Sequence, residues 1–336
     1  MKRNSQFIAL LLLIFLTVGP LLILFPALNI PQFLDSVKST DPVIFLFACM
    51  MMLVSNAFGA LRWSVFATEI NAPVSAQFSH AFGIYSLGQI AGLVVPSRIG
   101  NYAKVPLVKK LDTISYEDGI SAVNAETIID LMYIGLAGIV SLGILSVVLH
   151  SSFQFASLLL LLFLMASLFG ILVLLSNLDH FNERYERFRI TAGRSDQPFW
   201  KKVPARCMMK IYELSLSTRK IFTNKNCVVK SGFYTLVFQL IGMLSFFFVI
   251  EAAHETLPLT IVFAILTLSI LAGIISLIPG GFGASDISQI VLLVSQGISL
   301  PVATNIVILW RVVMYFPIVL VIGIYFIKTR LWFENT

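Results

Sequence analysis

Three ionisable side chains lie inside long apolar stretches of this sequence, where a charge has to serve a purpose. Glu126 and Asp130 are four residues apart and share one face of the helix predicted over 119–149, and Arg311 lies about two turns into the last apolar stretch. A carboxylate pair at this depth can take up a proton, bind a cation or pair with a buried arginine, for which Arg311 is the candidate. We therefore expect Glu126, Asp130 and Arg311 to gate a path or to couple it to protons or the membrane potential. A structural ion pair that joins two helices is the alternative.

Two other polar residues have simpler interpretations. Arg62 stands near the end of an apolar stretch and beside Trp63, a pattern typical of an anchor at the membrane surface. His80 flanks a weakly apolar segment, and we expect it to be a hydrogen-bonded residue at a helix interface.

Twice in the chain an apolar run meets a proline and reaches a glycine four residues later. The first pair is Pro96 and Gly100, and the second is Pro279 and Gly283. Proline lacks a backbone N–H and glycine tolerates positive φ, so each pair predicts a break in a membrane helix. Breaks at corresponding positions of two halves point to the binding site of a transporter.

The two breaks offer different means of holding an anion. Arg98 lies inside the first, with Lys104 nearby, and a guanidinium suits a phosphate because it donates paired, charge-assisted hydrogen bonds. The second is rich in glycine and is followed by a predicted helix start, where free N–H groups attract phosphate or carboxylate. Glycines also permit close helix packing, which is the alternative here. We expect the substrate site between the two breaks, built from Arg98, Lys104, Gly280, Gly281, Gly283 and Ser285.

The composition is that of an integral membrane protein. Hydrophobic residues make up 58% of the chain and charged residues 12%, against about 45–50% and 25% in soluble domains. Much of the positive charge lies between Asp179 and Lys230, where twelve Lys or Arg face five acids. This pattern predicts a cytoplasmic basic loop over 178–230 next to anionic lipid, with an amphipathic helix that includes Met208 and Ile221. No nucleic-acid-binding motif accompanies the charge, and the spacing of the cysteines and histidines suggests neither a metal nor another cofactor.

A membrane-spanning helix needs about 20 mostly apolar residues. Two weaker segments, 79–95 and 284–297, each adjoin one break, which predicts half-helices or re-entrant segments. With Lys and Arg placed in the cytoplasm, eight crossings and one re-entrant element satisfy all the charge clusters, although whether 79–95 and 284–297 span or re-enter stays open. The expected fold is therefore an all-α, polytopic membrane protein with about eight transmembrane helices. The clear candidate spans are 7–25 (for which a signal peptide is the alternative), 42–62, 119–149, 153–177, 231–250, 258–278 and 303–327.

The chain is expected to form a single transmembrane domain, 1–336, with repeat-like halves over about 42–149 and 231–328. The two breaks match at an offset of 183 residues, and an Ile-Ser pair follows each of them, at 114–115 and at 298–299. Transporters with internal repeats hold their substrate at the interface between the repeats. Chance similarity of two apolar, broken regions is the alternative.

These residues make the chain similar to the transmembrane region of lysylphosphatidylglycerol synthases and to the stand-alone, flippase-like membrane proteins related to it. The first pattern that carries the resemblance is Pro96-x-Arg98-x-Gly100 with the basic stretch to Lys110 and the acidic helix at Glu126 and Asp130. The second is Pro279-Gly280-Gly281-Phe282-Gly283, then Gly297-Ile298-Ser299, Ala303 and Arg311. The likeness covers nearly the whole chain. The chain departs at Thr127, where the family often has arginine, and at Asp286, where it usually has glutamate.

The resemblance implies a lipid flippase or transporter in the cell membrane, which moves an anionic phospholipid or a polyprenyl-phosphate-type lipid between leaflets. We expect no soluble domain after residue 336, and hence the lipid-translocating part without the aminoacyl-transferring enzyme. Expected partners are the anionic lipid and inner-leaflet lipids at the basic loop, a lipid-modifying protein is a further candidate, and no nucleic acid is expected. No Walker motif indicates direct use of ATP. The alternative function is a non-transporting accessory subunit of a lipid-modifying or glycosyltransferase system.

Overall fold

The structure is a computed structural model that describes residues 30–95, 97–148, 218–276, 278 and 280–329. These residues form helices and turns, with no strand among them, which confirms the all-α class. The spans expected at 7–25 and 153–177, and most of the amphipathic helix expected in the 178–230 loop, lie outside the described residues.

Four long helices are apolar enough to cross a membrane: α3 (Pro42–Glu69), α7 (Tyr116–Val148), α11 (Lys225–Ala252) and α14 (Leu300–Thr329). Each has at least 28 residues, which at about 1.5 Å per residue exceeds the roughly 30 Å of a hydrocarbon core. Side-chain caps fix where two of them begin. Asp41 accepts hydrogen bonds from the first backbone N–H groups of α3, and Asn224 does the same for α11.

Three apolar helices are shorter: α5 (Phe78–Val94) and α12 (Leu259–Ile275) have 17 residues each, and α13 (Ala284–Ser295) has 12. Helices α5 and α13 confirm the two undersized segments expected beside the breaks. Helix α12 differs from the full span expected over 258–278, because it ends at Ile275, just before the glycine-rich turn. The remaining elements are short: α2 (Ile30–Ser39), α4 (Pro73–Ala76), the 3₁₀ helix η2 (Ser97–Ala103) and α6 (Lys104–Asp112).

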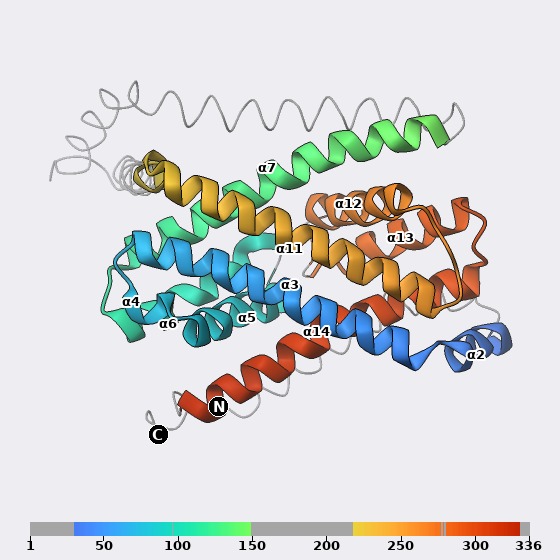
Figure 1. The fold of residues 1–336 in the computed structure, drawn as a ribbon, viewed down its shortest axis with the longest axis horizontal. Helices are drawn as coiled ribbons and strands as arrows, with labels where there is room; N and C mark the ends of the chain where they lie inside the picture. The colour runs from blue at the N-terminus through green and yellow to red at the C-terminus, as the bar shows by residue number, and fades with distance from the viewer. Residues whose placement is uncertain (1–29, 96, 149–217, 277, 279, 330–336) are drawn as a thin grey trace, which may run out of the picture.

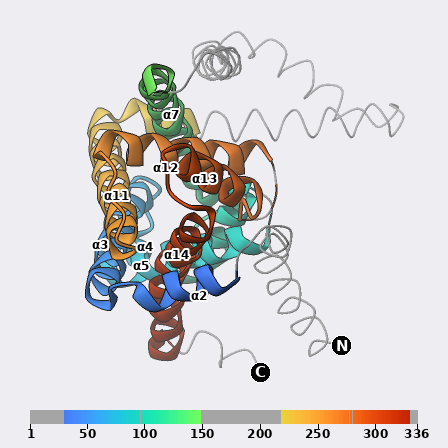
Figure 2. The same cartoon turned by 90° about the vertical axis from the view of Figure 1, so that its right-hand side faces the viewer.

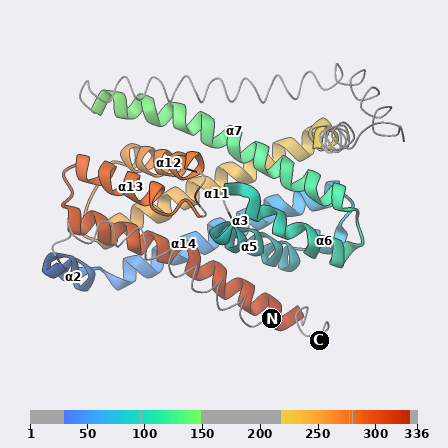
Figure 3. The same cartoon turned by 180° about the vertical axis from the view of Figure 1, so that it is seen from behind.

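The buried apolar side chains of the described residues form two large clusters and a small third one, which consists of Ile134, Leu142 and Leu271. Around Trp63 and Tyr85, residues of α3, α5, α6 and α7 pack together, whereas around Phe246 and Trp310 the core comes mainly from α11, α12, α13 and α14. Figures 1 and 3 show α5 and α6 toward one end of the molecule and α12 and α13 toward the other, and Figure 1 shows α4 beside α6. Helices α3 and α11 run side by side from one end of the molecule toward the other. In Figure 2 they lie together on one face.

The two predicted breaks meet in space between these ends. Helix α5 stops at Val94, and the backbone N–H of Gly280 in the second break donates to the carbonyl of Gly92, with N and O 3.0 Å apart. In the second break, Gly280, Gly281 and Gly283 all have positive φ, as expected. Gly100 is needed for a different reason: a Cβ there would lie 2.3 Å from the backbone N of Gly92. A glycine thus lets η2 pack directly on α5.

This contact predicts that Gly100→Ala destabilises the fold. The clash is with backbone, which cannot rotate away as a side chain can, so we expect a loss of about 1–3 kcal/mol and a lower melting temperature of the detergent-purified protein. Gly323→Ala in α14 is the matched control, because its Cβ would meet no atom within 4 Å. Equal melting temperatures for the two variants would contradict the close contact.

Candidate functional site

A cluster of four charged residues, Arg62, Lys104, Glu126 and Asp130, is buried between α3, α6 and α7; we call it the charge cluster. The Nη2 of Arg62 lies 2.7 Å from Oε1 of Glu126, its Nη1 pairs with Asp130, and the Nζ of Lys104 lies 2.5 Å from the other carboxylate oxygen of Glu126. Arg62, Lys104 and Glu126 are each 1% exposed or less. Thr235 of α11 accepts a further hydrogen bond from Arg62. Two positive and two negative side chains therefore balance formally, as burial in a low dielectric demands.

The charge cluster corrects two of the expected roles. Arg62 is not a surface anchor, because α3 continues for a further seven residues to Glu69 and thus carries Arg62 into the interior. It is Arg62, rather than Arg311, that pairs with the carboxylates of α7. The structural alternative, an ion pair that joins two helices, describes this contact correctly with a different arginine.

Lys104 was expected to contact substrate, but its side chain is fully buried in the charge cluster. Its Nζ lies 4.9 Å from the ring centre of Trp63 and 5.3 Å from that of Tyr85, which adds cation–π attraction to the ion pair. Gly88 makes room for it, since a Cβ there would lie 2.2 Å from Cε of Lys104. Lys104 thus helps to hold the charge cluster together and is not placed to contact a substrate.

Arg311 holds the second break together. Its Nε donates to Asp286 at 2.7 Å, Nη2 donates to the hydroxyl of Ser285 at 2.7 Å, and Nη1 donates to both the carbonyl of Gly280 at 3.2 Å and the hydroxyl of Tyr315 at 2.7 Å. One guanidinium thereby joins α14, the glycine-rich turn and the first turn of α13. Helix α13 begins at Ala284, which confirms the predicted helix start.

The backbone N–H groups of the three glycines described in the second break donate hydrogen bonds within the protein. Gly280 donates to Gly92, Gly281 donates to the carbonyl of Ile278, and Gly283 donates to the carboxylate of Asp286. The expected supply of free N–H groups for an anion is therefore not found at these three glycines. Side chains near this turn that carry N–H or O–H groups and line the cavity described next are those of Arg311, Ser285 and Tyr315.

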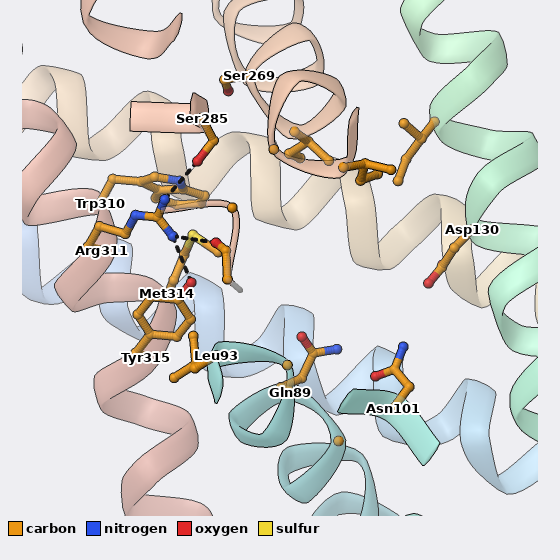
Figure 4. Close-up of a pocket in the computed structure, with 18 of the residues that line it drawn as sticks. Gln89, Leu93, Asn101, Asp130, Ser269, Ser285, Trp310, Arg311, Met314 and Tyr315 are labelled. Atoms are coloured by element: carbon orange, nitrogen blue, oxygen red, sulfur yellow. Dashed lines mark hydrogen bonds between the residues drawn. The ribbon is translucent and has the colours of Figure 1, made fainter. Parts of the chain in front are cut away.

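A cavity of about 270 Å³ lies where the two breaks meet, between the charge cluster and Arg311. Figure 4 shows Arg311 reaching toward it from α14 and Asp130 from α7, on opposite sides, with Gln89 and Asn101 on the α5 and η2 side. Among the sequence-predicted site residues, the cavity wall includes Asp130, Gly280, Gly281, Ser285 and Arg311. It also includes polar residues that the sequence analysis did not single out as site residues: Arg62, Tyr85, Gln89, Asn101, Gln239, Ser269, Gln289 and Tyr315.

Arg98 belongs to η2, whose backbone passes close to this cavity, but its side chain lies outside the described residues. Its role as a headgroup ligand therefore stays a prediction. His80 is hydrogen-bonded to the hydroxyl of Tyr325 at 3.0 Å, as expected of a residue between α5 and α14. In the described part of the chain, no group of three or more His, Cys, Asp or Glu is placed to hold a metal ion.

Comparison with known proteins adds the following findings. The sequence matches the family described as the lysylphosphatidylglycerol synthase TM region over residues 6–322. A UPF0104 membrane protein of Methanothermobacter thermautotrophicus is 22% identical over 288 residues, which cover 84% of this chain and 85% of that protein. A UPF0104 membrane protein of Pyrococcus horikoshii is 23% identical over 331 residues, or 95% and 97% of the two chains. No solved structure matches this chain.

The charge balance of the cluster predicts that a single variant is less stable than a double variant that keeps the cluster neutral. Arg62→Met leaves two buried carboxylates facing one lysine, so we expect a loss of about 3–5 kcal/mol of folding stability. Adding Asp130→Asn restores neutrality, and the double variant should recover most of this loss. Thermal melting in detergent gives the comparison. A double variant no more stable than Arg62→Met alone would show that charge balance is not what stabilises the cluster.

Proposed function

This chain belongs to the family of lysylphosphatidylglycerol synthase transmembrane regions, and from this premise we propose that it moves an anionic lipid between the leaflets of its membrane. The observation that carries the proposal is the polar cavity between the two helix breaks. In an apolar helical domain, exposed polar groups and irregular backbone are tolerated where they line a wet or ligand-binding space. Guanidinium, carboxylate, amide and hydroxyl groups converge on this one.

The charges on the wall favour an anionic headgroup. Arg62 and Arg311 both line the cavity, whereas Asp130 is the one carboxylate among the described lining residues. Glu126 and Asp286 neutralise the arginines from behind the wall. The residues that line the cavity are thus more positive than the two ion-pair groups to which the arginines belong. A positive lining suits a phosphate.

Exchange of hydrogen bonds gives the phosphate a means of binding. Two of the groups that Arg311 holds, the hydroxyls of Ser285 and Tyr315, are neutral and line the same cavity. A phosphate oxygen is a stronger acceptor than either hydroxyl, so it can take over the outer N–H groups while Asp286 keeps Nε. The headgroup then occupies the cavity while the acyl or prenyl chain stays in lipid.

We assign the remaining expected residues to supporting roles within this proposal. Arg98 receives the headgroup on the cytoplasmic side of the cell membrane. We place the basic loop 178–230 on the same side. Glu126, Asp130 and Arg311 gate the path or couple it to protons or the membrane potential. The proposed step moves a lipid without making or breaking covalent bonds.

Transport by purified protein in proteoliposomes tests the function, with labelled anionic lipids and a leaflet-specific quencher. We expect wild type to translocate at least one of them, and Arg311→Lys to be slower by about tenfold, because lysine keeps the charge but loses the fork that holds several partners. Ser285→Ala should also be slower. Ser288→Ala is its matched control on α13, since the Ser288 hydroxyl bonds the carbonyl of Ala284, within the helix. Folded protein that translocates none of the lipids would overturn the proposal and favour an accessory subunit.

Arg98 has a separate prediction in the same assay. Arg98→Ala should lower translocation while leaving membrane insertion and melting temperature unchanged, because its proposed role is contact with the headgroup. Lys110→Ala, an exposed residue of the same basic stretch, is the control. If Arg98→Ala transports at the wild-type rate, Arg98 is not a headgroup ligand.

A further inference from the structure

A second, larger cavity opens along the outside of the charge cluster. Its volume is about 670 Å³, and it forms a groove between α7, α11 and the helical residues 218–223. The walls are mainly apolar, from Ile129, Met132 and Leu136 on α7 and from Val228, Gly232 and Leu236 on α11. The stretch of α11 along the groove is about 12 Å long at 1.5 Å per residue. An apolar groove of this shape suits a hydrocarbon chain.

The groove and the central cavity are neighbours, and each shares lining residues with a small cavity of about 10 Å³ between them. Tyr133 lines both the groove and a small cavity beside it. Ile134, Gln239 and Ile270 line that small cavity and the central cavity as well. The contact between α7 and α11 at Tyr133 and Gln239, which we call the seam, therefore leads from the outer groove toward the polar cavity.

The inner wall of the groove also touches the charge cluster. Thr235 lines the groove, and its hydroxyl accepts a hydrogen bond from Arg62 at 3.2 Å. Arg62 itself lines the central cavity. One side chain thus separates the apolar groove from a guanidinium of the polar site.

One end of the groove is strongly basic. Arg219 lines it, and the sequence from 219 to 230 has four basic residues and no acid. Lys220, Lys225 and Lys230 are exposed. Basic residues near a membrane surface attract anionic lipid, so this end complements an anionic headgroup.

We propose that an anionic lipid loads at this groove, with its acyl chain between α7 and α11 and its phosphate at the Arg219 end, before the headgroup passes the seam at Tyr133. The inference rests on the proposed function, for which it supplies the entry route. Charge complementarity and the shared residues of the three cavities support this occupant over a segment of the protein itself.

Gly232 allows a direct test, because a Cβ there would meet no atom within 4 Å and a large side chain can fill the groove without disturbing the fold. The probe is phosphatidic acid with a photoactivatable acyl chain, in phosphatidylcholine vesicles. In wild type we expect the label on 129–136 and 228–236. Gly232→Phe should reduce that labelling by about tenfold or more, since it displaces several buried methylene groups. Gly323→Phe in α14, also with open space around its Cβ, is the matched control and should label as wild type does.

Arg219→Gln tests the headgroup end with the same probe. It should reduce labelling by photoactivatable phosphatidic acid while leaving labelling by the phosphatidylcholine counterpart unchanged. Melting temperatures establish that each variant is folded. The proposal is overturned if the label is confined to other helices, or if Gly232→Phe is labelled as fully as wild type. It is also overturned if the chain itself fills the groove, because the lipid would then be excluded.

Transport measured on the same proteoliposomes separates this proposal from the function on which it rests. If wild type translocates lipid and Gly232→Phe transports and labels equally well, the groove is not the entry route and the transport function stands. If wild type translocates no lipid, the transport function and the entry role of the groove both fail, while the label position still decides whether the groove binds lipid.

Discussion

A guanidinium inside a membrane domain has to be neutralised where it stands, and the placement of Arg62 organises much of this molecule. Its partners come from α7 and α11, and Lys104 of α6 completes the balance through Glu126. Four helices are thereby fixed around one point, although Arg62 and Thr235 are 173 residues apart in the sequence. The aromatic rings beside Lys104 and the glycine that makes room for it follow from the same requirement, because a charge cannot remain in this interior without close partners.

In the second half of the chain, Arg311 is neutralised with fewer charged partners than Arg62. Arg311 needs one carboxylate, and its other N–H groups are used to hold a backbone carbonyl and two hydroxyls. The glycine-rich turn is therefore shaped by a side chain from α14 as well as by its own positive φ angles. Two arginines, one from each half, end up on the wall of one cavity.

The sequence predicted best those features that depend on nearby residues. The helix breaks and undersized helices α5 and α13 follow from proline, glycine and diluted apolar character, which act locally. Pairing was not predictable in this way, because Glu126 and Asp130 can accept any arginine that the packing brings near. The burial of Arg62 is not evident from the sequence, because the strongly apolar stretch ends near it although α3 continues to Glu69. The hydrogen bond from Gly280 to Gly92 joins residues that only the folded chain brings together, so the state of the N–H groups in the second break could not be read from the glycines themselves.

The formal neutrality of both ion-pair groups has an electrical consequence. The charge cluster sums to zero, and so does the pair formed by Arg311 and Asp286. A membrane potential does about 2.3 kcal/mol of work per elementary charge per 100 mV, but this work vanishes for a neutral body that moves as a unit. If these helices rock with their ion pairs intact, they carry no net gating charge. In the proposed transport cycle the potential then acts on the anionic headgroup, which would make each cycle electrogenic, and the coupling of Glu126, Asp130 and Arg311 to the potential would require that an ion pair opens or a proton is exchanged.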